Sequence, residues 1–167
     1  MSSFWFYYII PFLSGYMFAS FGVYWIHRLM HDGKVHAKQH LDHHKKNTAQ
    51  GWLNEFRDYV QPGSVVILFG AALWFIYSWI ASLAWILGEV LCLAFNTFTH
   101  EVSHTNPSLA FWVKRPIHYF HHKNKQWKHN FGFTTIIWDV LFGTYQDDPS
   151  WKREKFSFRD YFKVKWL

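Results

Sequence analysis

Two long stretches of the sequence are almost free of charged side chains, and they determine the expected layout of the chain. Residues 4–26 carry no charge, and residues 64–99 carry only Glu89. A helix of about 20 apolar residues spans the hydrocarbon core of a bilayer, so the first stretch predicts one transmembrane helix. The second stretch is long enough for two short helices, and we interpret it as a membrane hairpin that turns near residues 77–82.

The polar stretches that follow each apolar stretch are rich in histidine, with one spacing used twice. Each set holds a pair four residues apart and then a triplet at positions i, i+3 and i+4. The sets are His27, His31, His40, His43 and His44, and then His100, His104, His118, His121 and His122. Residues three and four apart share a helix face, and imidazole suits iron, zinc, copper and nickel. Because ten ligands exceed one coordination sphere, the repeat predicts a site for two metal ions.

The remaining two histidines, His36 and His129, fall outside this repeat. We expect them to be supporting or surface residues rather than ligands. If both histidine sets share one site, the apolar stretch between them must leave and return on the same side of the membrane, which favours the hairpin. An odd number of crossings would separate the two sets.

The expected fold is therefore an all-α integral membrane protein with a single domain over residues 1–167. It has one N-terminal span at 4–26, a hairpin at 64–99, and a metal-binding cap formed by residues 27–62 and 100–167. All 17 lysines and arginines lie outside the apolar stretches, as in segments on the cytoplasmic side of membrane proteins. We expect the histidines on that side, in the endoplasmic reticulum or a bacterial inner membrane.

Shorter elements are expected within the cap. Residues 52–60 are amphipathic, which suits either a short helix in the membrane interface or a helix packed on the domain. The second hairpin helix should carry His100 and His104 and end at Asn106-Pro107. Pro116 should begin the next helix, and residues 136–142 should form a short one closed by Gly143. The basic, aromatic tail suits a membrane-surface or partner-docking segment, or a solvated edge.

Composition excludes several other classes of protein. The net charge of +6 would suit nucleic acid, but the sequence contains no nucleic-acid-binding motif. The single cysteine excludes an intrachain disulfide. No haem, flavin or iron–sulfur motif is present, so a redox reaction would need electrons from another protein.

The motifs HRLMH, HLDHH, HEVSH and HYFHH, followed by NFGFTTIIWDVLFGTY at 130–145, resemble the fatty acid hydroxylase and sterol desaturase superfamily. The ending Trp-Asp-x-Leu-Phe-Gly-Thr is the most specific part. The resemblance covers roughly residues 20–145. It implies a membrane di-iron enzyme that hydroxylates or desaturates a fatty acyl or sterol-like lipid with dioxygen, and it implies that all ten repeat histidines are ligands. Zinc could occupy the same nitrogens.

The residues themselves suggest partners and supporting groups. A separate electron donor, a ferredoxin or a small cytochrome with its reductase, would dock on the basic loop or tail. Glu101 and Asp139 are expected to accept an N–H from a ligating histidine, with a capping or salt-bridge role as the alternative for Asp139, and Asn130 is expected nearby. The alternatives to a lipid hydroxylase or desaturase are a carotenoid ring hydroxylase and a non-catalytic metal-binding membrane protein.

Overall fold

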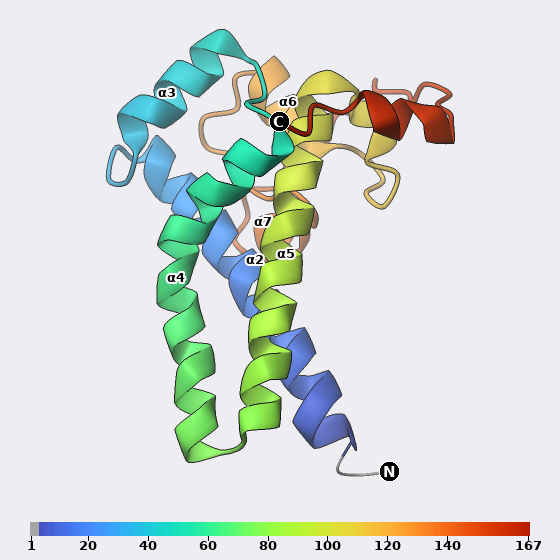
Figure 1. The fold of residues 1–167 in the computed structure, drawn as a ribbon. Helices are drawn as coiled ribbons and strands as arrows, with labels where there is room; N and C mark the ends of the chain where they lie inside the picture. Colours follow the sequence, from blue (N-terminus) through green and yellow to red (C-terminus); the bar gives the residue numbers. More distant parts are fainter. Residues whose placement is uncertain (1–3) are drawn as a thin grey trace.

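A computed structural model describes residues 4–167, apart from the side chains of residues 61–66. Its described residues form helices and no strand, which confirms the all-α prediction. The chain starts with a π-helical turn, η1 (Trp5–Ile9), that leads into α2. The α-helices are α2 (Ile10–His31), α3 (Ala37–Lys46), α4 (Trp52–Ile76), α5 (Trp79–Thr105), α6 (Ile117–Lys123) and α7 (Ile137–Leu141). Two 3₁₀ turns, η2 (Pro107–Leu109) and η3 (Phe158–Lys163), complete the order (Figure 1).

The three long helices α2, α4 and α5 form a bundle, with the N-terminus at the end opposite α3 and α6 (Figure 1). Helices α2 and α5 approach closely because glycine faces the neighbouring backbone on both. A Cβ at Gly15 would lie 2.9 Å from the carbonyl carbon of Trp85, and one at Gly88 would lie 2.9 Å from the Tyr16 nitrogen. Small residues at such crossings let helix backbones pack without intervening side chains.

Two helices in the described part of the chain are long and apolar enough to cross a membrane, namely residues Trp5–His31 and Trp79–Thr105. Helix α4 contributes a shorter apolar stretch, Ile67–Ile76. Large apolar side chains point outward from α4, with Phe75 86% and Ile76 77% exposed. Exposed apolar side chains of this density suit a lipid environment rather than water.

The hairpin prediction agrees with the α4–α5 pair, which turns at Tyr77–Ser78. The Ser78 side chain accepts a hydrogen bond from the Ile80 nitrogen at 3.2 Å and so begins α5. The idea of a separate interfacial helix over 52–60 is wrong, because these residues are the first turns of α4. The packed alternative is correct, since Phe56 and Tyr59 pack against a core formed by Val23, Leu93 and Phe133.

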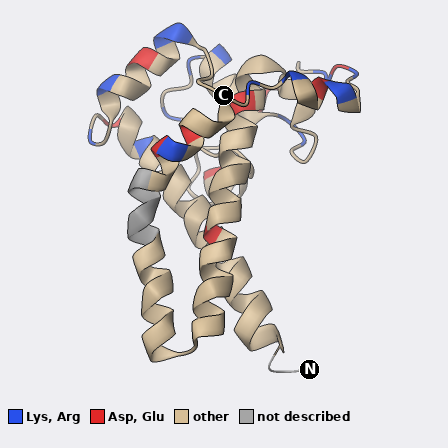
Figure 2. Ribbon diagram, in the orientation of Figure 1, with Lys and Arg blue, Asp and Glu red and all other residues tan. Residues whose placement is uncertain are grey.

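The charged end of the molecule is built by the shorter elements. Lysine and arginine gather at the end away from the N-terminus (Figure 2). As expected, α5 ends just before Asn106-Pro107, Pro116 precedes α6, and Gly143 (φ +67°) follows α7. The tail packs on the protein: Val164 is buried in a core with Val102 and Leu109. The expected boundary between hairpin and cap, at residues 62–64, falls inside α4.

Candidate metal centre

The ten repeat histidines converge into two groups of five at the charged end of the bundle. Within each group the ligand atoms lie within 4.8 Å of one another. We call His27, His31, His40, His44 and His121 group one, and His43, His100, His104, His118 and His122 group two. The rings of His44 and His122 stack with centroids 3.9 Å apart, so the two groups are adjacent.

Group one joins the last turn of α2 to α3 and α6. The Nε2 atom of His31 lies 2.8 Å from those of His40 and His121 and 3.2 Å from that of His44. Adjacent ligands at right angles around an ion with metal–nitrogen bonds of about 2.1 Å would be separated by about 3 Å. The ring nitrogens therefore already have the spacing of ligands around one ion.

Group two joins the last turn of α5 to α3 and α6. His43 Nε2 lies 3.1 Å from His100 Nε2. The ring centroids of His104 and His122 are 4.4 Å apart, and those of His100 and His118 are 4.5 Å apart. Several of these buried nitrogens have no hydrogen-bond partner, including both nitrogens of His118 and of His122. Buried polar atoms without partners are costly, and a metal ion would satisfy the inward nitrogen of each ring.

The two groups do not follow the two sets defined by the sequence. Each takes four histidines from one half of the chain and one from the other, because His43 and His121 are exchanged. Helix geometry explains the exchange: at roughly 100° per residue, residues i and i+4 point in nearly the same direction. His40 and His44 therefore face one group, while His43 is rotated by about 100° from His44 and faces the other. The same reasoning separates His121 from His118 and His122 on α6.

Main-chain carbonyls hold the outer nitrogens of group one. His27 Nδ1 donates to Phe131 O at 2.7 Å, and His121 Nδ1 donates to His129 O at 2.7 Å. A carbonyl can only accept, so each Nδ1 carries the proton and each Nε2 has a free lone pair for an ion. These contacts give residues 129–131 a role that the histidine spacing did not reveal.

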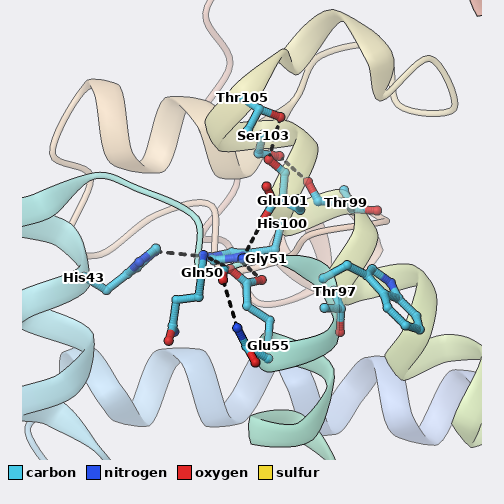
Figure 3. A network of polar contacts seen from close by, with 12 residues as sticks. His43, Gln50, Gly51, Glu55, Thr97, Thr99, His100, Glu101, Ser103 and Thr105 are labelled. Atoms are coloured by element: carbon cyan, nitrogen blue, oxygen red, sulfur yellow. Dashed lines mark hydrogen bonds and ion pairs between the residues drawn. The ribbon is translucent and has the colours of Figure 1, made fainter. Parts of the chain in front are cut away.

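A carboxylate takes the corresponding place in group two. Glu55, which is 2% exposed, lies with Oε2 2.5 Å from His100 Nδ1 (Figure 3). The histidine spacing does not indicate Glu55, although its position in the sequence does. It lies three residues after Trp52 and four before Tyr59, on the apolar face of an amphipathic helix. A charged residue on such a face indicates a buried partner.

The expected supporting residues act elsewhere. Glu101 accepts a hydrogen bond from Gly51 N at 3.1 Å rather than from a histidine ring (Figure 3). Asp139 accepts hydrogen bonds from the Phe131 and Gly132 nitrogens, both at 2.8 Å. The direct histidine contact expected for both carboxylates is therefore wrong within the described residues. Asp139 instead supports the segment whose Phe131 carbonyl accepts from His27.

Asn130 and the Trp-Asp-x-Leu-Phe-Gly-Thr ending complete this support. Asn130 has φ +60° and donates to Gln126 Oε1 at 2.7 Å and to Gln146 O at 2.8 Å. Thr144 Oγ1 donates to Asp139 at 2.7 Å. A Cβ at Gly132 would lie 2.8 Å from Asp139 Oδ2, so the approach of the carboxylate requires glycine there. The Trp-Asp-x-Leu-Phe-Gly-Thr sequence thus folds into a brace behind group one.

Burial keeps the proposed ligands outside the long helices neutral. Desolvation, together with a smaller contribution from neighbouring histidines, lowers the pKa of His43 to about 3 and that of His44 to about 4. The pKa values of His121 and His122 are also lowered, mainly by burial. Neutral imidazole is the form that binds metals, so the donor set fits two ions of a nitrogen-preferring metal.

A cavity of about 320 Å³ opens beside both groups. Its histidine wall includes members of each, namely His27, His40, His43 and His100. Its apolar wall is formed by Val23, Ile26, Met30, Tyr59 and Phe133. His36 lines the same cavity but belongs to neither group, in keeping with its place outside the repeat.

Comparison with known proteins identifies the family. No curated protein sequence and no solved structure gives a significant match. The sequence model described as "Fatty acid hydroxylase" matches residues 12–144. This range contains all ten grouped histidines, Glu55, the cavity and the brace around Asp139. The chain therefore belongs to the fatty acid hydroxylase family.

Proposed function

We propose that this protein is a membrane oxidoreductase that uses two iron ions, dioxygen and electrons from a separate protein to hydroxylate or desaturate a lipid. The observation that carries the proposal is a cavity with an apolar wall whose other wall contains histidines of both five-histidine groups. Family membership supports lipid oxidation, and the all-nitrogen donor set is compatible with iron. Zinc would fit the same nitrogens, so the identity of the metal is part of the proposal.

Each group would hold one ion through its five Nε2 atoms or the equivalent inward nitrogens. Iron bound there would supply the dioxygen chemistry that attacks an unactivated C–H bond. The chain's own residues orient the ligands: the Phe131 and His129 carbonyls fix two rings of group one, and Glu55 fixes His100 of group two. Fixed tautomers keep the inward nitrogens unprotonated.

The cavity suits an amphipathic substrate. Its apolar wall, from α2 and the segment at Phe133, would hold the hydrocarbon part, while Gln39, Gln50 and Asp58 would contact a polar end. Tyr59 and Phe133 lie between these regions and exclude water from the histidines. A lipid could reach the cavity from the bilayer, since α2 is one of the two candidate spans that line or flank it.

The charge distribution supports an orientation for the protein. The lysines and arginines lie at the histidine end (Figure 2), and basic residues favour the cytoplasmic side. We therefore propose that the metal groups face the cytoplasm, in the endoplasmic reticulum or a bacterial inner membrane. Cysteine labelling at positions 2 and 157 in sealed vesicles tests this, and protection of both from the same side contradicts it.

Reconstitution tests the activity. The protein is loaded anaerobically with ferrous iron in lipid, then given labelled dioxygen and a reductase system. Hydroxylation should yield a lipid that contains one labelled oxygen atom, whereas desaturation should consume dioxygen without labelling the lipid. A preparation with two firmly bound ions that neither consumes oxygen nor alters any lipid supplied would favour a metal-binding protein without catalysis.

A further inference from the structure

A second cavity, of about 720 Å³, reaches the metal groups from another side. Its floor includes His44 of group one and His104 and His122 of group two. It shares no lining residue with the lipid cavity. Its rim is formed by exposed residues of α3, of α6 and of the loop that follows α6. The proposed function assigns no role to this opening.

Trp127 connects this opening to group one. Its side chain is 45% exposed, yet its ring stacks on His44 with centroids 5.2 Å apart and an interplanar angle of 28°. It also meets His31 edge to face at 5.0 Å. An exposed tryptophan in contact with two proposed ligands provides a short aromatic path from the surface to the metal group. Exposed large aromatics at a surface depression are typical of contact sites for other proteins.

The rim of the opening is positively charged. Lys45, Lys123 and Lys125 line it, and all three are exposed. Asp42 Oδ1 lies 3.8 Å from Lys45 Nζ. The pKa of Asp148 is lowered mainly by hydrogen bonds from Ser150 and slightly by the charge of Lys123, which places this carboxylate near the lysine. These acids offset part of the charge. The neighbouring Lys46 and Lys128 are also exposed and add to the positive side.

We propose that the lysine–tryptophan face, formed by Lys45, Lys123, Lys125 and Trp127, is the docking site of an acidic one-electron carrier protein and that electrons enter through Trp127. The inference rests on the proposed oxidoreductase function. A positive rim around an aromatic contact complements an acidic carrier, and transient electron-transfer encounters need only a small interface. The basic tail is the weaker site, since Phe156 and Tyr161 pack it onto the protein.

The electron balance requires repeated, short-lived docking. Hydroxylation of one C–H bond by dioxygen forms one C–O bond, and the other oxygen atom leaves as water. The reaction consumes two electrons and two protons. A one-electron carrier is oxidised once in each encounter, so two encounters supply one turnover. A site with weak, salt-sensitive affinity allows the spent carrier to leave.

Binding is tested with the iron-loaded, full-length protein in discs of neutral lipid. The probes are an acidic [2Fe–2S] ferredoxin and, separately, an acidic small cytochrome. At low ionic strength, Lys123→Glu/Lys125→Glu should weaken binding of at least one probe by about tenfold or more, and the difference should shrink with added salt. Lys152→Glu/Lys155→Glu, exposed lysines of the tail with the same charge change, is the matched control and should weaken binding less than about threefold.

Electron entry is tested by stopped-flow reduction of the oxidised protein. With the carrier at saturating concentration, so that weaker docking does not limit the rate, Trp127→Leu should keep its iron but accept electrons at least about tenfold more slowly, because the aromatic contact with two ligands is lost. Reduction by dithionite, which needs no docking site, should be unchanged. Trp127→Phe keeps an aromatic ring and should recover much of the rate.

Specific outcomes would overturn the inference. Equal weakening by both charge-reversal pairs would show an effect of total charge, and binding of neither probe by the unaltered protein would remove the docking site. An unchanged carrier rate in Trp127→Leu would remove the path. All of these measurements are made without a lipid substrate. If the binding and reduction tests succeed but no lipid is oxidised, only the proposed function is contradicted. If lipid is oxidised with dithionite as reductant but the binding and reduction tests fail, only the docking site is contradicted.

Discussion

The two histidine groups contain the same number of rings but are supported differently. In group one, the outer nitrogens of His27 and His121 donate to main-chain carbonyls of the 129–131 segment. In group two, the outer nitrogen of His100 meets the carboxylate of Glu55, and His118 and His122 have outer nitrogens without hydrogen-bond partners. A neutral brace therefore supports one group and a single anion supports the other.

This difference has a chemical consequence. A carboxylate partner raises the basicity of a ligating imidazole more than a carbonyl does, so the two ions would differ in electronic environment despite similar ligands. The difference in support also has a mechanical consequence. Group one depends on a loop held by several hydrogen bonds around Asp139, whereas group two depends on one buried side chain at the start of α4. We expect the two groups to respond differently to single substitutions.

Removing a proposed ligand should have the largest effect and should test how the histidines divide. His43→Ala should lose the ion of group two, as His100→Ala does, while His40→Ala and His121→Ala should lose the ion of group one. Each variant should retain about one ion per chain and lose more activity than the roughly 100-fold that loss of a supporting residue costs. Metal analysis and spectroscopy of the remaining ion distinguish the two classes.

His36→Ala is the matched control, because His36 lines the cavity but belongs to neither group. It should keep both ions. If His43→Ala instead resembles His40→Ala in the ion it loses, the division follows the order of the sequence and our grouping is wrong. If His36→Ala strips the site as fully as His40→Ala, the set of proposed ligands is wrong.

Glu55→Gln should have the next largest effect, confined at first to group two. The amide can still accept the His100 hydrogen bond but carries no charge, so metal affinity at group two should fall about 10- to 100-fold. Stepwise removal of metal by a chelator measures the two affinities separately. Glu154→Gln makes the same change at an exposed position and should leave both unchanged. Equal loss from both groups would show that Glu55 supports the fold rather than one ion.

The sequence predicted which histidines converge, but not how they divide. The spacing of i, i+3 and i+4 shows that three rings lie on one side of a helix. Only the position of a second helix decides that His43 faces α5 while His44 faces α2. The acceptors for His27 and His121 could not be predicted, because main-chain carbonyls have no residue signature. Glu55 could have been found from its place on an apolar helix face.

The fold, too, could be predicted from the sequence only in part. Charge-free stretches predicted the N-terminal helix and the turn after residue 76, because burial in lipid requires apolar length. Pro62-Gly63 usually signals a break, yet α4 is continuous from Trp52 to Ile76. Packing of its first turns on Val23, Leu93 and Phe133 is a tertiary contact that local propensity does not encode.

Asp139→Asn should have a smaller effect, in group one. Its two carboxylate oxygens accept hydrogen bonds from the Phe131 and Gly132 nitrogens. Asparagine replaces one of these oxygens with an NH2 group, which cannot accept, so one of the two hydrogen bonds is lost. We expect a loss of about 1.5–3 kcal/mol in stability, the usual value for a hydrogen bond to a charged group, with weaker metal binding at group one only. Denaturant unfolding and metal analysis measure these. Asp160→Asn, at a half-buried surface carboxylate that also accepts from a backbone nitrogen, should cost less than about 1 kcal/mol. Selective loss of the group-two ion would contradict the assignment of Asp139 as a support of group one.

Tyr24→Phe should have the smallest effect and separates the stability of the brace from its hold on the metal. The buried Tyr24 hydroxyl lies 3.0 Å from Thr144 Oγ1, and Thr144 keeps its 2.7 Å hydrogen bond to Asp139 without it. The same hydroxyl accepts a longer hydrogen bond from Arg28 Nη1 at 3.4 Å. Stability should fall by about 1–1.5 kcal/mol, the net value of one hydrogen bond together with a weak second one, while both ions remain. Tyr8→Phe, at an exposed tyrosine, should change neither quantity. The Tyr24 hydroxyl bonds to Thr144, whereas the Phe131 nitrogen is held by Asp139. Loss of the group-one ion in Tyr24→Phe would therefore mean that His27 is positioned by the whole α2–α7 contact rather than by Asp139.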